Sequence, residues 1–347
     1  MRKTTITHYA LRVMKLRLLS TAAVQKALPM AQAIAGMKEA FAQLSLGQAE
    51  VPLRGRVDVR GFSSNLSRGT TLVMPAHLQR SQALAVKIVS VFQGNPALNL
   101  PLIHGLVLVL KAETGEPLAL LEGGSLTAIR TGAGSGAATD LLARPDAATV
   151  AIIGSGVQAR TQLEAVCTVR TITEVRVYSP DRDHAAAFAA EMAGVGPIPQ
   201  QVVVADSAAT AVTNADIICA ATTSASPVFP GSQLKPGAHV NGVGSYTPTM
   251  QEVDADTIRR ARVVVDSRSA VLAEAGDLII PIQQGLIDES HIHAEVGEVV
   301  MGLKNGRSHP DQITYFKSVG VAVQDAIAGQ IAYANAQAHD LGTVVEL

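Results

Sequence analysis

The chain has 347 residues, of which 48% are hydrophobic, 16% charged and 3% aromatic, and its formal net charge is −1. This length suggests about two domains, and the balance of charges excludes the strongly basic surface that nucleic-acid binding requires. The low charged fraction is typical of a chain that buries surface within the fold or between subunits, so we expect an oligomer.

The N-terminal segment lacks the apolar core and the small-residue cleavage site of a signal peptide, and no later window is long and apolar enough for a membrane span. We therefore expect a cytoplasmic protein, with residues 1–13 as a loose extension before Met14. Cys167 and Cys219 lie in apolar segments and are expected to be buried structural thiols.

The first predicted element is one amphipathic helix. Ser20 is a good N-cap, and after Pro29 apolar residues recur at helical spacing until Gly47 supplies a stop. The apolar positions are Ile34, Met37, Phe41 and Leu44.

From Val51 to about Leu121 the pattern changes to antiparallel strands, because β-branched runs such as TTLVMP and LAVKIVSVF stand between turn signals. Residues 113–116 predict a hairpin turn. From Thr149 onward short apolar runs alternate with helical patterns, which predicts parallel strands with crossover helices. The chain ends with a short strand and a helix, whose apolar face is predicted to hold Val323, Ile327, Ile331 and Ala334.

The clearest motif is Gly154-Ser-Gly156-Val-Gln-Ala159, which follows an apolar strand and opens a helix. In this context G-x-G-x-x-A predicts a dinucleotide site: the first glycine allows a tight turn, and the second lets a pyrophosphate approach the helix N-terminus. Ala159 permits close packing of helix on strand. A plain tight turn is the alternative.

The end of the second strand of this unit indicates which cofactor is used. Proteins that bind NAD usually have an acidic residue there, but this chain has Tyr178 and Ser179. Ser179 and Arg182 can accommodate a 2′-phosphate, so we expect NADPH, with NADH as the alternative because Asp181 is close. Arg182 could equally be a solvated side chain.

Three cations in apolar surroundings predict an anionic substrate. Lys87 stands within LAVKIVSVF, where a buried ammonium needs an anion, unless the strand is an edge whose lysine points to water. Arg54 and Arg130 can hold a carboxylate through two hydrogen bonds, although each alone could be a surface ion pair. His104 is a candidate proton donor or a core histidine. No metal-ligand spacing and no G-x-S-x-G motif occurs.

These motifs together resemble the ornithine cyclodeaminase/mu-crystallin family over nearly the whole chain from about Met14. The resemblance rests on VPLR, VMPA, TGEPLALLEGGSLTAIRTGAGS, LARPDAATVAIIGSGVQA, GVGSYTPTMQEVD and YFKSVGVAVQDA. It implies an α/β fold in which a Rossmann-type dinucleotide-binding domain, residues 129–316, is inserted into an α+β sheet domain. The latter, residues 1–128 and 317–347, would bind substrate and form a homodimer.

The resemblance also implies roles for individual residues. Arg54, Lys87 and Arg130 match the residues that bind the substrate carboxylate. The matches to the cofactor site are Thr131, Gly154, Gly156, Val157, Gln158, Ala159, Thr222, Val243 and Ser318.

Members of the family catalyse different reactions, and two departures favour one of them. Ornithine cyclodeaminases carry a Glu where this chain has Leu72 and an Asp where it has Gly244-Ser245-Tyr246. The segment GSYTPTMQE is instead similar to the bacterial reductases of cyclic ketimines. We therefore expect NAD(P)H-dependent reduction of Δ1-pyrroline-2-carboxylate, and of Δ1-piperideine-2-carboxylate, to L-proline and L-pipecolate. In that reaction Lys87 or His104 would keep or supply the imine proton. The alternatives are an ornithine cyclodeaminase, an L-alanine dehydrogenase, or a crystallin-like protein that binds NADPH without turnover.

Overall fold

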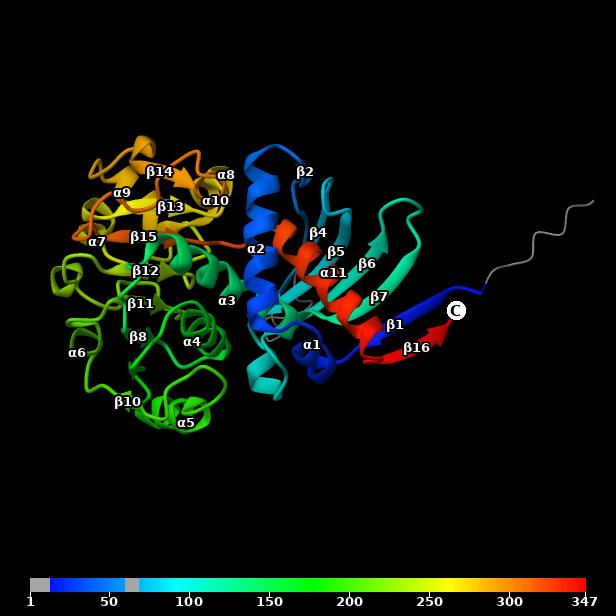
Figure 1. Ribbon diagram of the computed structural model, residues 1–347, viewed down its shortest axis with the longest axis horizontal. Helices are drawn as coiled ribbons and strands as arrows, with labels where there is room; N and C mark the ends of the chain where they lie inside the picture. Colours follow the sequence, from blue (N-terminus) through cyan, green and yellow to red (C-terminus); the bar gives the residue numbers. More distant parts are fainter. Residues whose placement is uncertain (1–12, 60–68) are drawn as a thin grey trace, which may run out of the picture.

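The computed structural model describes residues 13–59 and 69–347, and these residues form two eight-stranded sheets (Figure 1). The expectation for residues 1–13 therefore lies, apart from Val13, outside the described residues. None of the described helices is long and apolar enough to cross a membrane.

The first sheet has the strand order β16-β1-β7-β6-β5-β4-β2, with β3 also paired to β4. Its pairs are antiparallel except for β1 with β7. The elements of this part are β1 (Lys15–Leu19), α1 (Thr21–Ala27), α2 (Met30–Ser45), β2 (Ala49–Glu50), β3 (Gly55–Val59), β4 (Gly69–Leu78), β5 (Ala83–Phe92), β6 (Ile103–Lys111), β7 (Pro117–Glu122), α3 (Gly123–Leu142), α11 (Ala322–Ala338) and β16 (Thr343–Glu346).

The predicted early helix is interrupted. Ser20 does cap a helix, accepting a hydrogen bond from Ala23 N at 3.4 Å, but that helix is the short α1. Pro29 then starts α2, since the residue before a proline is pushed out of the helical region, and Leu28 is non-helical. The hairpin at residues 113–116 is confirmed, joining β6 to β7.

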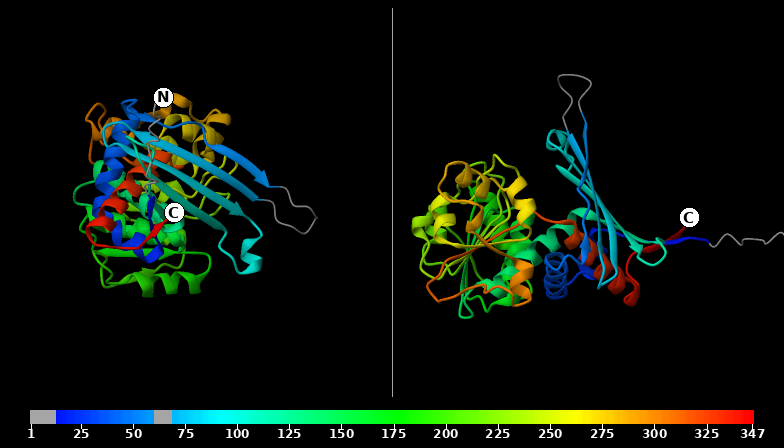
Figure 2. Two further views of the ribbon diagram at one scale, coloured as in Figure 1. Left: turned by 90° about the vertical axis from the view of Figure 1, so that its right-hand side faces the viewer. Right: turned by 90° about the horizontal axis from the view of Figure 1, so that it is seen from above.

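Helices α2, α3 and α11 lie between the first sheet and the second (Figures 1 and 2). Helix α11 contacts β4, β5 and β6, and its buried face differs in part from the prediction. Val323 and Ile327 are buried as expected, but Ala334 is exposed. The face instead continues along Ala332 and Ala336, because small side chains let the helix approach the sheet closely.

The second sheet is parallel throughout, in the order β10-β9-β8-β11-β12-β15-β13-β14. Its elements are β8 (Thr149–Ile153), α4 (Val157–Val169), β9 (Glu174–Tyr178), α5 (Arg182–Met192), β10 (Val202–Val204), α6 (Ala208–Val212), β11 (Ile217–Ala220), β12 (His239–Gly242), α7 (Ala255–Arg260), β13 (Arg262–Val265), α8 (Arg268–Glu274), α9 (Gly276–Gln283), β14 (Ile292–Glu295), α10 (Val296–Val300) and β15 (Thr314–Lys317). Short 3₁₀ helices occupy Asn95–Leu98, Gly231–Gln233 and Glu289–His291.

Both faces of this sheet are covered, which explains its continuous apolar runs. One apolar cluster includes α4 and α5, and another includes α6 to α9. The α/β fold class with parallel crossover units is thus confirmed. Cys167 and Cys219 are buried free thiols as expected, and burial raises the pKa of each to about 12.

Helix α3 joins the two halves. It contacts α2 on one side and α4 on the other, and a Cβ at Gly132 would come within 2.5 Å of the Thr161 carbonyl oxygen, so only glycine fits there. Its C-terminal carbonyls at Thr139, Asp140 and Ala143 accept hydrogen bonds from Arg170. This cap satisfies groups that a helix end leaves unpaired.

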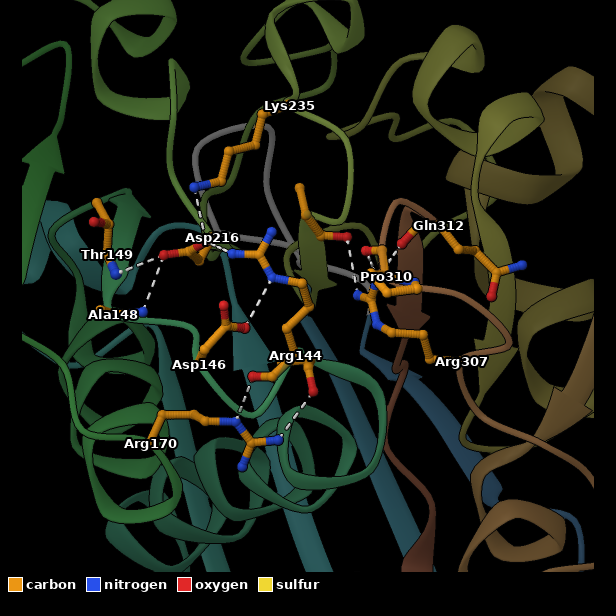
Figure 3. A network of polar contacts seen from close by, with 12 residues as sticks. Arg144, Asp146, Ala148, Thr149, Arg170, Asp216, Lys235, Arg307, Pro310 and Gln312 are labelled. Atoms are coloured by element: carbon orange, nitrogen blue, oxygen red, sulfur yellow. Dashed lines mark hydrogen bonds and ion pairs between the residues drawn. The ribbon is translucent and has the colours of Figure 1, made fainter.

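A polar network lies at the amino ends of the parallel strands (Figure 3). Asp216 accepts hydrogen bonds from Ala148 N and Thr149 N, both at 3.0 Å, and pairs with Arg144 at 2.6 Å and Lys235 at 2.7 Å. Although partial burial opposes ionisation, these partners together lower the pKa of Asp216. The network fixes the strand ends opposite to those that carry the cofactor motif.

His239 gives the fold a pH dependence. Its ring is fully buried between Thr314 Oγ1 at 2.9 Å and Asn241 Oδ1 at 3.1 Å. Burial, with Arg307 nearby, lowers its pKa from 6.5 to about 3. The unfolded chain therefore binds a proton here below pH 6.5 that the folded chain does not, so stability is lost as the pH falls.

We expect His239 to make the free energy of unfolding decrease between pH 7 and pH 5, with a slope of at most about 1.4 kcal/mol per pH unit. Urea unfolding at several pH values measures this slope for the native protein and for His239→Gln. The variant should show a shallower slope, whereas His309→Gln, which changes an exposed histidine, should not. An unaltered slope in His239→Gln would contradict the assignment.

Candidate active site

Lys87 is buried in the middle of the first sheet. Strand β5 lies between β4 and β6, where Lys87 is in register with Met74 and Val107, and the residue is 3% exposed. Alternation along the strand turns Ala83, Ala85 and Lys87 toward the helices. The alternative of an edge strand with a solvated lysine is therefore wrong.

The anion that Lys87 requires is provided by the chain itself. Asp325, on α11, forms an ion pair with Lys87, whose Nζ is 2.6 Å from Oδ2, and accepts a hydrogen bond from Arg130 Nε at 3.0 Å on Oδ1. Gln324 Oε1 accepts Arg130 Nη1 at 3.0 Å. Lys87, Arg130 and Asp325 are each less than 10% exposed, and we call these three residues the cation cluster.

The sequence did not point to Asp325 or Gln324. One signal was available, because an acidic residue stands between Val323 and Ile327 on the apolar face of a predicted helix. A charge on such a face requires a partner, yet nothing in the local pattern identifies which distant cation supplies it.

The cluster sets the protonation of Lys87. Burial is the largest of the effects that lower the pKa of Lys87, Asp325 raises it, and Arg130 and Arg54 lower it, so that the pKa is about 8. For Asp325 burial acts to raise the pKa, but Lys87 and Arg130 outweigh it and the pKa is lowered. The ammonium is therefore protonated at neutral pH and close to the pH at which it can exchange a proton.

Arg54 lies beside the cluster, in the segment before β3. Its Nη2 is 3.3 Å from Glu274 Oε1 and donates to the Gly320 carbonyl at 3.5 Å. Glu274 ends α8 in the half that holds the second sheet, so this ion pair joins the two halves. The pKa of Glu274 is raised, because burial outweighs the opposing effect of Arg54.

The structure does not bring His104 to this group. His104 is exposed and is in register with Ser90, three positions from Lys87 along β5. Side chains alternate between the faces of a strand, so His104 and Lys87 lie on opposite faces of the sheet. Within one chain His104 is therefore not placed to exchange a proton at the cluster.

The glycine-rich turn has the geometry that its sequence predicts. Gly154 has φ +106°, and a Cβ there would lie 2.6 Å from the Ala221 carbonyl oxygen. Gly156 is the N-cap of α4, and a Cβ there would meet nothing within 4 Å. Ala159 is fully buried against the sheet. The helix N-terminus thus faces open space at Gly156, which fits the approach of a pyrophosphate.

Neighbouring side chains at this turn also fit a bound dinucleotide. Val157 is 66% exposed, and Gln158 Oε1 is buried without a partner among residues 13–59 and 69–347. Thr131, on α3, faces the same helix, since its carbonyl accepts from Gln162 at 3.4 Å. An apolar side chain left open and an unpaired buried acceptor are both features that a ligand can satisfy.

The other residues matched to the cofactor site lie at the same edge of the sheet. Gly154, Thr222, Val243 and Ser318 each follow the carboxyl end of a parallel strand: β8, β11, β12 and β15. In the sheet, β9 and β10 lie on one side of β8, and β11 and β12 lie on its other side, so the order of the strands reverses between β8 and β11. In open α/β sheets, ligands bind in the crevice at this point, beyond the carboxyl ends of the strands.

Two buried carboxylates that the sequence did not point to hold these loops. Glu252 accepts from Thr222 N at 2.5 Å and Gly244 N at 2.7 Å, and burial raises its pKa to about 6. Asp266 accepts from the Ser318 hydroxyl at 2.8 Å and from Gly320 N at 2.8 Å. The loops at this edge are therefore fixed by internal hydrogen bonds.

Ser179 and Arg182 lie at the ends of β9 and α5. Ser179 is half-buried, whereas Arg182 is exposed and pairs with Asp206 at 3.0 Å. Asp181 accepts a hydrogen bond from His184 N at 2.9 Å as the N-cap of α5. The capping role occupies one carboxylate oxygen of Asp181, and the arginine stays at the surface where it can turn toward a ligand.

The fold and the site together define the protein as an oxidoreductase of the α/β class. Its glycine-rich turn fits a dinucleotide, and the buried cation cluster lies in the same molecule. The chain belongs to the ornithine cyclodeaminase/mu-crystallin family, whose model matches residues 14–340. This confirms the resemblance noted in the sequence. In the part of the chain that the structure describes, no group of three or more His, Cys, Asp or Glu side chains could hold a metal ion.

Among curated relatives, the chain is similar to Delta(1)-pyrroline-2-carboxylate reductase from Bacillus cereus, with 44% identity over 280 residues, 80% of this chain and 85% of the relative. Among solved structures, the same-named enzyme of Thermococcus litoralis, in complex with NADH and L-proline, matches with a TM-score of 0.88 and 44% identity over 94% of this chain and 99% of that chain. An archaeal alanine dehydrogenase dimer with bound NAD matches with a TM-score of 0.85 and 32% identity over 96% and 99%.

A pair of glycine variants separates the two functions of the turn. Gly154→Ala should destabilise the fold by about 1 kcal/mol or more, because the backbone is left-handed and the methyl group would clash. Gly156→Ala should leave the melting temperature unchanged and weaken dinucleotide affinity at least tenfold, since its methyl group would enter the open space. Thermal unfolding and calorimetric titration with NADPH measure both. Equal affinity in Gly156→Ala and native protein would exclude this space as the pyrophosphate site.

Proposed function

We propose that the protein is an NAD(P)H-dependent reductase of cyclic imino acids that converts Δ1-pyrroline-2-carboxylate to L-proline and Δ1-piperideine-2-carboxylate to L-pipecolate. The observation that carries the proposal is the cation cluster beside a dinucleotide-type sheet edge. Similarity to named reductases over most of the chain supports the same reaction.

The charges suit a substrate with one carboxylate. Arg54, Lys87 and Arg130 contribute three positive charges, and Asp325 and Glu274 two negative ones, so one positive charge is left over. Donors are also left over: within the described residues, Arg130 Nη2 has no partner and Lys87 Nζ uses Asp325 alone. These groups would hold the carboxylate and fix which face of the imine is presented.

Reduced nicotinamide supplies the hydride when it is bound. The residues of the chain contribute orientation and a proton. Lys87 would keep the imine nitrogen protonated, which makes its carbon the better electrophile, and the lowered pKa of Lys87 suits this exchange. His104 lies on the other face of the sheet and, within one chain, is not placed to take this role.

The two departures from ornithine cyclodeaminases add no carboxylate at this site. Leu72 is partly buried against the apolar core, and Gly244 donates its N–H to Glu252. A site without these acids lacks groups for a second, cationic amine. The similarity to the archaeal alanine dehydrogenase keeps reductive amination of a keto acid as a second candidate.

We further propose a cytoplasmic homodimer. The outer face of the first sheet presents a row of apolar side chains in register, Val73, Ile88 and Leu106, which are 36%, 46% and 47% exposed. Such a face would be covered by a second copy, and the archaeal relative is described as a dimer. A cytoplasmic location suits two free thiols and a need for reduced nicotinamide.

In this proposal the two halves of the protein have different functions. Residues 1–128 and 317–347 bind substrate and dimerise, while residues 129–316 bind the dinucleotide. Both boundaries fall within regular elements, α3 and β15, so the halves are connected rigidly instead of through flexible linkers.

The direct test is oxidation of NADPH with each cyclic imino acid, compared with pyruvate plus ammonia and, in the reverse direction, with ornithine plus NAD. We expect turnover only with the cyclic imino acids.

Lys87→Ala should lower kcat/KM at least about a hundredfold, a loss of about 2.7 kcal/mol of transition-state stabilisation. In the native enzyme kcat/KM should decrease as the pH rises through about 8, where Lys87 loses its proton. Normal turnover in Lys87→Ala would remove Lys87 from the mechanism.

The cofactor preference has its own test. If Arg182 binds a 2′-phosphate, Arg182→Ala should raise KM for NADPH about tenfold and leave KM for NADH nearly unchanged. Arg259→Ala removes a comparably exposed arginine of an ion pair and serves as the control. A native enzyme that strongly prefers NADH would refute the preference for NADPH.

A further inference from the structure

Asp325 contacts both buried cations with separate oxygens. Oδ2 is 2.6 Å from Lys87 Nζ and Oδ1 accepts Arg130 Nε at 3.0 Å, and the residue is 1% exposed. The three groups come from three elements, α11, β5 and α3. The carboxylate therefore fixes the position of each cation relative to the other.

The adjoining residue restrains the guanidinium further. Gln324 Oε1 accepts Arg130 Nη1 at 3.0 Å and also Val321 N at 3.0 Å. Arg130 is thus held at Nε and Nη1 by the first turn of α11, and Nη2 is the nitrogen left for a ligand. A carboxylate that served only to neutralise buried charge would not need to orient this group.

We propose that Asp325 is a positioning residue, which aims Lys87 and Arg130 at the substrate carboxylate and keeps Lys87 charged in the working enzyme. The inference rests on the proposed function for its substrate. Its electrostatic part concerns only groups of the chain itself.

The charged groups around Lys87 make this role decisive. Burial most strongly disfavours its charge, Arg130 of α3 and Arg54 of the segment before β3 add to this effect, and the pKa is about 8 with Asp325 in place. Glu274 of α8 faces Arg54 at 3.3 Å. The flanking strands bring only Met74 and Val107 opposite Lys87. Asp325 is therefore the carboxylate in contact with the ammonium, and its neutralisation should lower the charged fraction of Lys87 at neutral pH.

Three variants test the inference through the pH profile of kcat/KM for imine reduction. In Asp325→Asn the decrease at alkaline pH should move to lower pH by about one unit or more. Asp325→Glu keeps the charge and should keep the decrease near its native pH, even if kcat is reduced. Asp216→Asn removes a buried carboxylate of the remote network in Figure 3 and should lower the melting temperature without moving the profile.

A second measurement does not depend on any substrate. With lysine labelled with ¹³C at Cε, the Lys87 resonance is assigned by its absence in Lys87→Arg, and its titration is followed in the native protein, Asp325→Asn and Asp325→Glu. A midpoint lowered in Asp325→Asn and retained in Asp325→Glu supports the inference even if the substrate proves to be different. An equal midpoint in native protein and Asp325→Asn overturns it, as does a profile that loses height at every pH without shifting. If Asp325→Asn does not fold, the titration of Lys87 in Asp325→Glu decides. A Lys87 midpoint clearly below the native one in this variant, although its carboxylate charge is kept, overturns the inference.

Discussion

Two cations cannot be buried next to an apolar sheet without a counter-charge, and this constraint organises the molecule. Lys87 and Arg130 are held in place by Asp325, which the chain reaches only after building the second sheet. The return of α11 to the first sheet is therefore more than a matter of covering apolar surface. It completes the charge balance of the site, and it leaves donors of both cations available for an anion.

The same return connects the site to the cofactor edge. Strand β15 ends at Lys317 in the second sheet, and α11 begins beside the first sheet after the four residues 318–321. Asp266 accepts hydrogen bonds from Ser318 and Gly320 of the connecting segment, and the Gly320 carbonyl accepts one from Arg54. Hydride transfer requires a fixed distance between substrate and nicotinamide, and this short, hydrogen-bonded connection is what fixes the two halves relative to each other.

Much of this could be predicted from the sequence, for reasons that are local. The turn at Gly154 is encoded by glycines between a strand and a helix, and the burial of Lys87 by its place in a β-branched run. The break at Pro29 was also visible in the sequence, although one continuous helix was expected. The partners could not be predicted in this way. Asp325 meets Lys87 across a large separation in sequence, and strands β1 and β16 pair the two ends of the described chain, so no periodic pattern records either contact.

His104 shows the opposite limit. Its residue type suits proton transfer, but the strand register turns it to the outer face, and register is decided by pairing and not by residue type.

The position of Asp325 near the end of the chain has a consequence for biosynthesis. A ribosome delivers Lys87 and Arg130 long before their carboxylate. Strand β5 and helix α3 therefore emerge with one cation each that cannot be buried stably, and the surface later covered by α11 is still bare. The parallel sheet that follows can fold in the meantime, since β8 to β15 all lie within residues 149–317, ahead of α11. The first half of the molecule is thus completed last, and until then its exposed strands are open to incorrect association.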